Sequence, residues 1–471
     1  MKDVGKMSPV QRLALITIGI AQLFIAVDYS SVYVAMPSMG ADLGMSEVSL
    51  QWIITAYGLP FAGFMLLGGR LVDRYGAVRT FVFGNVAFGA ASVMAALATD
   101  GGLLLGSRVV QGLAAAVLSP AILALLSVNF PDGPNRSRAY SIWGAVGASG
   151  LAFGVLLGGG LTEISWRWIF IINIPLVLVC IAGVLKISDA EKHGDENSRV
   201  PILSTTLGTA SVLLLVLALT FVGEGTSDAA PIAVTGAAAI IVTIAFLVNE
   251  RRSRTPLVDR ALRKISTLRR GALGAALYMS SVGTEFFIIT LYLQDQRDYS
   301  PVAAGIAFLP LAAFVTLGNI FAGRLLKRLT VARTLGLGFA ISAAGLLLLA
   351  FSLSIESYWI ALLPGFVISG LGHGMVYTSM FVLGNTDVKP ELSGSAGSLI
   401  TASQYSSAAF GTAVLTIIIV AVQGSAGFAW GFGFNALVAV AGIALAATTR
   451  LRGAEVSEAE AKDSEAVPSM S

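Results

Sequence analysis

Three ionisable side chains, Asp28, Arg108 and Glu285, interrupt long apolar stretches of the chain. In a membrane each such charge costs about 2.5–3.5 kcal/mol to insert, and residues of this kind usually serve an ion or substrate pathway. The chemistry open to Asp28 and Arg108 is ion pairing or proton transfer, because a guanidinium stabilises the charged form of a neighbouring carboxylate. Two interpretations stay open: a static ion pair that offsets the cost of burial, and a carboxylate that gains and loses a proton.

Glu285 differs from Asp28 because no basic residue is expected at its depth, which favours a neutral carboxyl group for much of the time. This suits a proton carrier or a contact for a cationic substrate, and a passive cavity wall is the alternative. His373, in the sequence Gly-Leu-Gly-His-Gly, is expected to lie deeper toward the cytoplasm as a hydrogen-bonded packing residue. The polar residues that we regard as a possible substrate cavity are Gln22, Tyr57, Gln111, Asn319, His373 and Gln404.

Several kinds of enzyme chemistry are missing from the sequence. There is no GxxxxGK[ST] phosphate loop, and the only two histidines, His193 and His373, cannot form an HExxH zinc site. The single cysteine, Cys180, excludes an intrachain disulfide. We therefore expect no enzyme, no catalytic residues, no metal and no cofactor. The basic residues are expected to anchor the chain at a membrane surface, and no nucleic-acid partner is expected.

The elements that must position these residues are long apolar segments. Hydrophobic residues make up 55% of the 471 residues and charged residues 12%, and the mean hydropathy of +0.81 lies outside the range of soluble domains. A membrane-spanning helix needs about 20 apolar residues. We count fourteen such stretches, at roughly 13–36, 50–68, 80–99, 101–128, 139–161, 168–186, 201–222, 231–248, 272–294, 302–323, 334–352, 357–382, 394–422 and 427–448.

The basic residues between these stretches predict the topology. With a cytoplasmic N-terminus, 27 of the 30 Lys and Arg residues fall on the inside, whereas only Arg167 and Arg297 fall outside and Arg108 lies within a stretch. This asymmetry follows the positive-inside rule and supports an even number of crossings, with both termini in the cytoplasm. A rise of 1.5 Å per residue then places Asp28, Arg108 and Glu285 at a similar depth, roughly 10–14 Å below the outer surface.

Two polar segments, 187–200 and 249–271, enclose two of the stretches and leave six before and six after. The expected fold is an all-α integral membrane protein. It has a six-helix half at 1–186, two extra spans with flanking cytoplasmic loops at 187–271, a second six-helix half at 272–449 and a disordered acidic cytoplasmic tail at 450–471. A short repeat relates the halves, since Gly69-Arg70-Leu71-Val72-Asp73-Arg74 resembles Gly323-Arg324-Leu325-Leu326-Lys327-Arg328. Paired halves with a site between them are typical of secondary transporters.

Five motifs stand in the first 180 residues: Asp28-Tyr29-Ser30-Ser31-Val32-Tyr33-Val34-Ala35-Met36-Pro37, Gln51-Trp52-Ile53-Ile54-Thr55-Ala56-Tyr57, Gly69-Arg70-Leu71-Val72-Asp73-Arg74-Tyr75-Gly76, Arg108-Val109-Val110-Gln111-Gly112 and Trp166-Arg167-Trp168-Ile169-Phe170-Ile171-Ile172-Asn173-Ile174-Pro175. Together they resemble motifs of the major facilitator superfamily, in particular its fourteen-span drug/proton antiporter branch. The resemblance implies a major-facilitator-type fold, with two six-helix halves plus two extra central spans.

The resemblance also implies roles for individual residues. Gly69, Asp73, Arg74, Gly76 and Arg79 would form a cytoplasmic latch that biases the outward-facing state, because carboxylate–guanidinium bonds must break when the halves rock. Arg108 would support proton transfer with Asp28. Glu285, which stands out by its cost in lipid and not by the resemblance, completes the expected proton-coupling set.

A glycine stripe at Gly150, Gly154, Gly158 and Gly159 is similar to the antiporter motif of that branch. Glycines at this spacing let two helices approach closely. Val155 departs from the pattern, because the branch has a proline there, and this departure weakens the motif as a sign of antiport direction.

The expected function is proton-coupled secondary active efflux of hydrophobic or cationic drugs or antibiotics across the cytoplasmic membrane, by alternating access. The expected partners are protons, a small hydrophobic or cationic substrate and the lipid bilayer, with the chain as a monomer. One alternative is transport of a specific metabolite such as a peptide, an amino acid or a siderophore. Another is a non-transporting membrane sensor, which the intramembrane carboxylates disfavour because a sensor needs no titratable pair.

Overall fold

The computed structural model describes residues 7–130, 134–187, 202–223, 229–253, 256, 258, 260–326, 328–388, 392–422 and 424–449, and within them every regular element is helical. The first part of the chain forms α1 (Pro9–Leu43), α2 (Glu47–Tyr75), α3 (Ala77–Ala96), α4 (Gly101–Asn129), α5 (Pro134–Ile164), α6 (Trp168–Ile171) and α7 (Asn173–Leu185). The middle part forms α8 (Ile202–Gly223), α9 (Ala229–Arg252) and α10 (Arg260–Arg263). The last part forms α11 (Ser266–Leu291), a π-helix η2 (Tyr292–Gln296), α12 (Pro301–Leu325), α13 (Val331–Ser352), α14 (Tyr358–Ala361), α15 (Leu363–Asn385), α16 (Ser393–Val422) and α17 (Gly424–Ala447).

The helices have the length and composition of membrane spans, which confirms the prediction of an all-α membrane protein. Among the described residues, thirteen helical segments are long and apolar enough to cross a bilayer. Three of these segments join two elements each, namely α6 with α7, α11 with η2, and α14 with α15. The remaining long helix, α5, has 31 residues, of which Phe153–Ile164 form its described apolar part. This architecture is consistent with the fourteen expected crossings.

Capping side chains mark where several of the helices begin. Ser8, Ser46, Asp100, Ser300 and Thr330 each accept a backbone N–H three residues ahead, at the starts of α1, α2, α4, α12 and α13. Such bonds satisfy a donor that has no partner inside the helix. The local sequence therefore sets these helix starts before tertiary packing acts.

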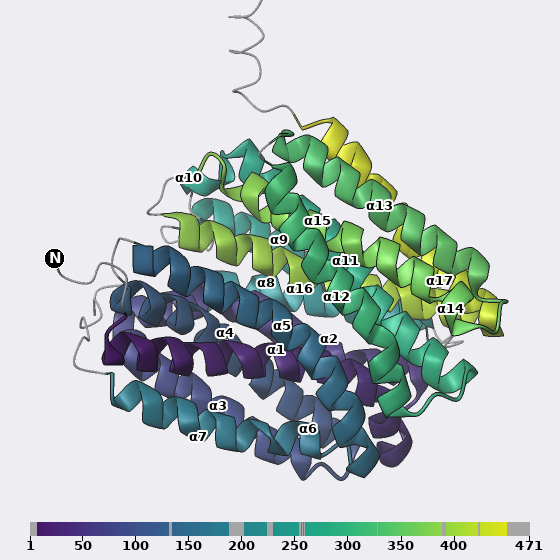
Figure 1. The fold of residues 1–471 in the computed structure, drawn as a ribbon, viewed down its shortest axis with the longest axis horizontal. Helices are drawn as coiled ribbons and strands as arrows, with labels where there is room; N and C mark the ends of the chain where they lie inside the picture. Colours follow the sequence, from purple (N-terminus) through teal and green to yellow (C-terminus); the bar gives the residue numbers. More distant parts are fainter. Residues whose placement is uncertain are drawn as a thin grey trace, which may run out of the picture.

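Two bundles of helices lie side by side (Figure 1), α1–α7 in purple and blue and α11–α17 in green and yellow. In the first bundle α1 packs on α5, and α4 packs on α2 and α3, whereas in the second α15 packs on α12 and α13, and α11 packs on α16. The bundles meet where α5 contacts α12 and where α2 contacts α16, and α8 packs against both α2 and α16. The division at 1–186, 187–271 and 272–449 stays a prediction.

We call the face at which α1 begins the inner face and the opposite one the outer face. Gln11, near the start of α1, donates a hydrogen bond to the Asn129 carbonyl at the end of α4, so both residues lie at the inner face. Tyr405 of α16 meets Tyr29 of α1 and Phe61 of α2 near the middle of these helices, and other contacts between the bundles lie toward the outer face. There Gln294 Nε2 donates to the Val34 carbonyl oxygen at 2.8 Å, and the rings of Tyr33 and Phe286 are 5.9 Å apart.

Candidate functional site

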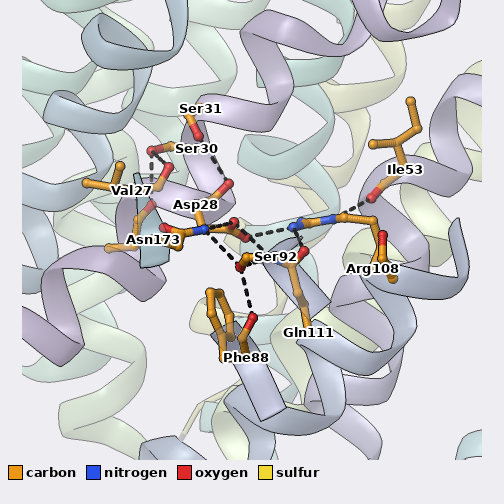
Figure 2. A network of polar contacts seen from close by, with 12 residues as sticks. Val27, Asp28, Ser30, Ser31, Ile53, Phe88, Ser92, Arg108, Gln111 and Asn173 are labelled. Atoms are coloured by element: carbon orange, nitrogen blue, oxygen red, sulfur yellow. Dashed lines mark hydrogen bonds and ion pairs between the residues drawn. The ribbon is translucent and has the colours of Figure 1, made fainter. Parts of the chain in front are cut away.

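Asp28 and Arg108 form an ion pair inside the first bundle. The distance from Arg108 Nη1 to Asp28 Oδ2 is 2.7 Å, and the two residues are 1% exposed or less. The other carboxylate oxygen of Asp28 accepts hydrogen bonds from Asn173 Nδ2 at 2.9 Å and from Gln111 Nε2 at 3.3 Å. Figure 2 shows Arg108 and Gln111 of α4 and Asn173 of α7 converging on Asp28 of α1. The contact that similar depth predicted for this pair is therefore present.

The guanidinium group of Arg108 is held by several groups besides Asp28. Its Nε donates to the Ile53 carbonyl of α2 at 3.2 Å, and its Nη1 also reaches Gln111 Oε1 at 2.8 Å. Its Cζ lies 4.4 Å from the centroid of the Tyr57 ring, a distance at which a cation and an aromatic face attract each other. Arg108 and Gln111 are three residues apart on α4, so their side chains share one face of the helix.

Ser92 of α3 completes this network. Its hydroxyl accepts from Gln111 Nε2 at 2.9 Å and from Asn173 Nδ2 at 3.4 Å, and it donates to the Phe88 carbonyl at 2.9 Å (Figure 2). Groups from five helices, α1, α2, α3, α4 and α7, thus belong to one network around the buried carboxylate. In this arrangement the cation neutralises the carboxylate, and the amides satisfy its remaining lone pairs.

A second buried site lies in the other bundle, where Glu285 of α11 meets His373 of α15. The distance from His373 Nε2 to Glu285 Oε2 is 2.6 Å, and Ser369 Oγ donates to Glu285 Oε1 at 2.8 Å. The other imidazole nitrogen, Nδ1, lies 3.2 Å from Ser342 Oγ. Glu285 and His373 are at most 1% exposed.

Two expectations about this second site are wrong: Glu285 has a basic partner, and His373 is not deeper than Glu285. The reason is a break in the helix that carries His373. The range 357–382 was treated as one straight span, but α14 ends at Ala361 and α15 begins at Leu363. Counted from Leu363, His373 lies about 15 Å into α15, and Glu285 lies about 16 Å before Gln296, the end of η2. The two residues therefore reach the same level.

The remaining candidates for the substrate cavity occupy different surroundings. Tyr57 and Gln111 are fully buried in the Asp28 network. Asn319 Oδ1 accepts a hydrogen bond from Thr378 at 3.0 Å, and Gln404 of α16 is buried. Gln22 lies where α1 faces Gly147 of α5. A cavity lined by these residues stays a prediction.

The glycine stripe of α5 has two separate neighbours. A Cβ atom at Gly150, Gly154 or Gly158 would collide with α1, and at Gly158 it would lie 2.7 Å from the Ser31 Cα and carbonyl oxygen. A Cβ atom at Gly159 would instead lie 2.7 Å from the Pro301 carbonyl oxygen of α12, in the other bundle. The stripe therefore packs α5 within its own bundle, while Gly159 belongs to the contact between the bundles.

The predicted latch lies at the inner end of α2 and the start of α3. Gly76 joins these two helices with a φ of 85°, a conformation that favours glycine. A side chain at Gly69 would meet nothing, Arg79 is exposed, and the Arg74 guanidinium lies 5.4 Å from the Tyr75 ring centroid. The Asp73 side chain lies outside the described part of the chain, so the latch stays a prediction.

Four residues of the two sites were not among the predicted site residues: Ser92, Asn173, Ser342 and Ser369. Asn173 stands within the Trp166–Pro175 motif, so the motif itself held a signal for it. The serines carry no such signal, because serine is common in membrane helices and bonds to its own backbone in most of them. Among the described residues, no three side chains of His, Cys, Asp or Glu gather as metal ligands would.

Comparison with known proteins identifies relatives over most of the chain. The family model described as Major Facilitator Superfamily matches residues 18–412. The chain is 34% identical to the puromycin resistance protein pur8 of Streptomyces alboniger over 86% of this chain and 81% of that protein. It is 34% identical to the cephamycin export protein CmcT of Amycolatopsis lactamdurans, over 86% and 84% of the two chains. The methylenomycin A resistance protein of Bacillus subtilis is 29% identical, with 92% of each chain covered.

Solved structures show the same fold at low sequence identity. A crystal structure of an auto-inhibited POT family peptide transporter superposes with a TM-score of 0.69, covering 93% of this chain and 98% of that one at 16% identity. At this identity the likeness concerns the fold alone.

Proposed function

Because the chain belongs to the major facilitator superfamily, we propose that it exports a hydrophobic or cationic drug or antibiotic in exchange for protons, by alternating access. Several relatives support this substrate class, since they are named for resistance to puromycin or lincomycin or for the export of cephamycin. In this proposal Asp28, Arg108 and Glu285 form the proton-coupling set, and no enzymatic step or cofactor is involved.

The observation that carries the proposal is the pair of buried ionisable sites, one in each bundle. The pairs Asp28–Arg108 and Glu285–His373 cost free energy to bury in a membrane. Neither pair lies at a helix end, where a charged side chain could reach the membrane surface. A protein that only needed stable helices would gain from apolar residues at these positions. A transporter that exchanges protons needs ionisable groups there.

The membrane and the direction of transport belong to the same proposal. We place the chain in the cytoplasmic membrane as a monomer with both termini in the cytoplasm, so that the inner face is the cytoplasmic one. The 27-to-2 distribution of basic residues supports this orientation. Gly69, Asp73, Arg74, Gly76 and Arg79 then form a latch that closes the cytoplasmic side in the outward-facing state. Export of one defined metabolite is the alternative within the same fold.

The test is a flux measurement on the purified full-length chain in liposomes that carry an imposed pH gradient. Addition of puromycin should dissipate the gradient, and Asp28→Asn should abolish that response by removing the charge that pairs with Arg108. Asp42→Asn is the matched control, because Asp42 is a carboxylate on the same helix that lies 48% exposed beside Arg167. Puromycin movement that continued unchanged without any pH gradient would refute proton exchange.

A further inference from the structure

The two buried sites differ in how readily they can take up a proton. Asp28 accepts hydrogen bonds from Arg108, Asn173 and Gln111, and all three are donors at these nitrogen atoms. A protonated Asp28 would point its O–H at one of them and lose that bond. Arginine stays charged in proteins, so a neutral Asp28 would also leave a buried cation without its counter-charge. The surroundings of Asp28 therefore match only the ionised carboxylate.

Among the described residues, Glu285 contacts no permanent cation. Its nearest partner, His373, can carry a charge or lose it, and imidazole is the side chain that most readily does so near neutral pH. Ser369 and Ser342 contribute hydroxyl groups, and each hydroxyl can donate or accept a hydrogen bond. The contact between Oε2 and Nε2 is satisfied by a carboxylate beside an imidazolium, by a carboxylic acid beside a neutral imidazole, and by a carboxylate beside a neutral imidazole.

Among the described residues, the hydrogen bonds and ion pairs of Glu285 and His373 involve no further charged side chain that would compete for the proton. The titratable groups that face the pair are phenols: Tyr278 of α11 lies 6.0 Å from the His373 ring, and Tyr377 of α15 lies 5.7 Å from Tyr278. Tyr405 of α16 and Tyr33 of α1 belong to the same aromatic surroundings. Other charged groups of this bundle and of α10 lie at helix ends: Arg260 and Arg263 of α10, Arg269 and Arg270 of α11, Asp295 of η2, Arg324 of α12 and Arg333 of α13. Further phenols are Tyr292 of η2 and Tyr358 of α14, and α17 contains no titratable residue.

We propose that the exchangeable proton is held jointly by Glu285 and His373, while Asp28 stays ionised and positions Arg108. With the proton bound the pair is neutral overall. Release of the proton to water leaves the Glu285 carboxylate beside a neutral imidazole, with a net charge of −1. This inference rests on the proposed function and assigns the proton within it. A negative charge that appears only after proton release would attract a cationic substrate at that moment, which couples the two movements.

Infrared difference spectroscopy on the purified chain can identify the residue that carries the proton, with no substrate present. Ordinary exposed carboxyl groups are ionised above about pH 6, so a carboxylic acid band that remains at higher pH reports a buried group. We expect such a band in the unmodified chain, because a carboxylic acid beside a neutral imidazole holds the proton without placing two charges in the buried site. It should disappear in Glu285→Gln and remain in Asp28→Asn.

His373 has its own prediction. In His373→Leu the carboxyl group keeps Ser369 as its hydrogen-bond partner and loses the imidazole, so the carboxylic acid band should move in frequency. Ser92→Ala, which alters only the Asp28 site, should leave the band unchanged. A band that vanished in Asp28→Asn and persisted in Glu285→Gln would overturn the proposal. If Glu285→Gln does not fold, Glu285→Asp decides the question, because it should move the band, whereas an Asp28 origin would leave it in place.

The infrared experiment and the flux measurement can fail separately. A chain that showed the Glu285 band but no puromycin-driven proton flux would refute the exchange and leave the proton site standing. The reverse result, flux without the band, would refute the shared proton and leave the exchange standing.

Discussion

At the scale of single residues, Arg108 shows how the first bundle tolerates a charge. Its Nη1 donates to a carboxylate and to an amide oxygen, its Nε donates to a main-chain carbonyl, and the Tyr57 ring covers its flat face. A lysine could not reproduce this arrangement, because its ammonium group is a single point of charge at the end of a flexible chain. The arginine therefore acts as a fixed counter-charge for Asp28.

The stability of this pair can be tested by removing its members one at a time and together. Arg108→Gln leaves the Asp28 carboxylate buried without a counter-charge, so we expect the free energy of unfolding to fall by about 3–5 kcal/mol. Asp28→Asn combined with Arg108→Gln removes both charges and should recover most of that loss. Denaturant titration of the purified chain in detergent measures both values. A double variant as unstable as Arg108→Gln would show that hydrogen bonding, rather than charge pairing, dominates at this site.

The two basic residues that the sequence places outside, Arg167 and Arg297, have parallel roles in the two bundles. Arg167 donates to the Ala98 carbonyl between α3 and α4, and Arg297 donates to the Leu353 and Ile355 carbonyls between α13 and α14. Each arginine thus forms hydrogen bonds to the outer turn that follows the third long helix of its bundle. The positive-inside rule counts these residues as exceptions, and their contacts give a structural reason for keeping an arginine there.

At the scale of helices, neighbouring glycines of α5 provide a matched comparison. Gly158 touches the backbone of α1 at Ser31, whereas a Cβ atom at Gly160 would have nothing within 4 Å. Gly158→Ala should force α5 away from α1 and cost about 1–3 kcal/mol, the range for overpacking in a close-packed interior. Gly160→Ala should change the free energy of unfolding by less than about 0.5 kcal/mol. Equal effects of the two substitutions, measured in the same denaturant titration, would contradict the proposed packing role.

The apolar pattern predicted the helices well because each crossing must satisfy its own backbone hydrogen bonds, which leaves helix as the main solution in lipid. The pairing of Asp28 with Arg108 was expected from their similar depth and from their place in the same half of the chain. The pairing of Glu285 with His373 did not, because hydropathy continues smoothly across Leu362 and hides the break between α14 and α15. The serines of both sites were beyond prediction, since the rotation of a helix about its axis decides which serine faces a buried charge.

At the scale of the whole molecule, one group of contacts between the bundles lies toward the outer face. Gln294 in η2 donates to the Val34 carbonyl of α1, and Pro37 interrupts the backbone hydrogen bonds of α1 just beyond this point. A π-helix and a proline kink are places where a helix can change direction without losing its fold. Together with the proposed orientation, these contacts correspond to a conformation that is closed on the outside.

One added carbon atom, the Cβ of an alanine at position 159, should weaken the contact between the bundles at the outer face. A Cβ atom at Gly159 would lie 2.7 Å from the Pro301 carbonyl oxygen and 3.0 Å from the Val302 Cα, both in the opposite bundle. Gly159→Ala should therefore separate the outer ends of α5 and α12 and shift the population toward states that are open on the outside. Spin labels at two exposed outer positions, Ser46→Cys and Ser354→Cys in a Cys180→Ser background, report the distance between the bundles. We expect a longer and broader distance distribution in Gly159→Ala than in the Gly160→Ala control. Identical distributions in the two variants would mean that the contact between α5 and α12 does not hold the outer side closed.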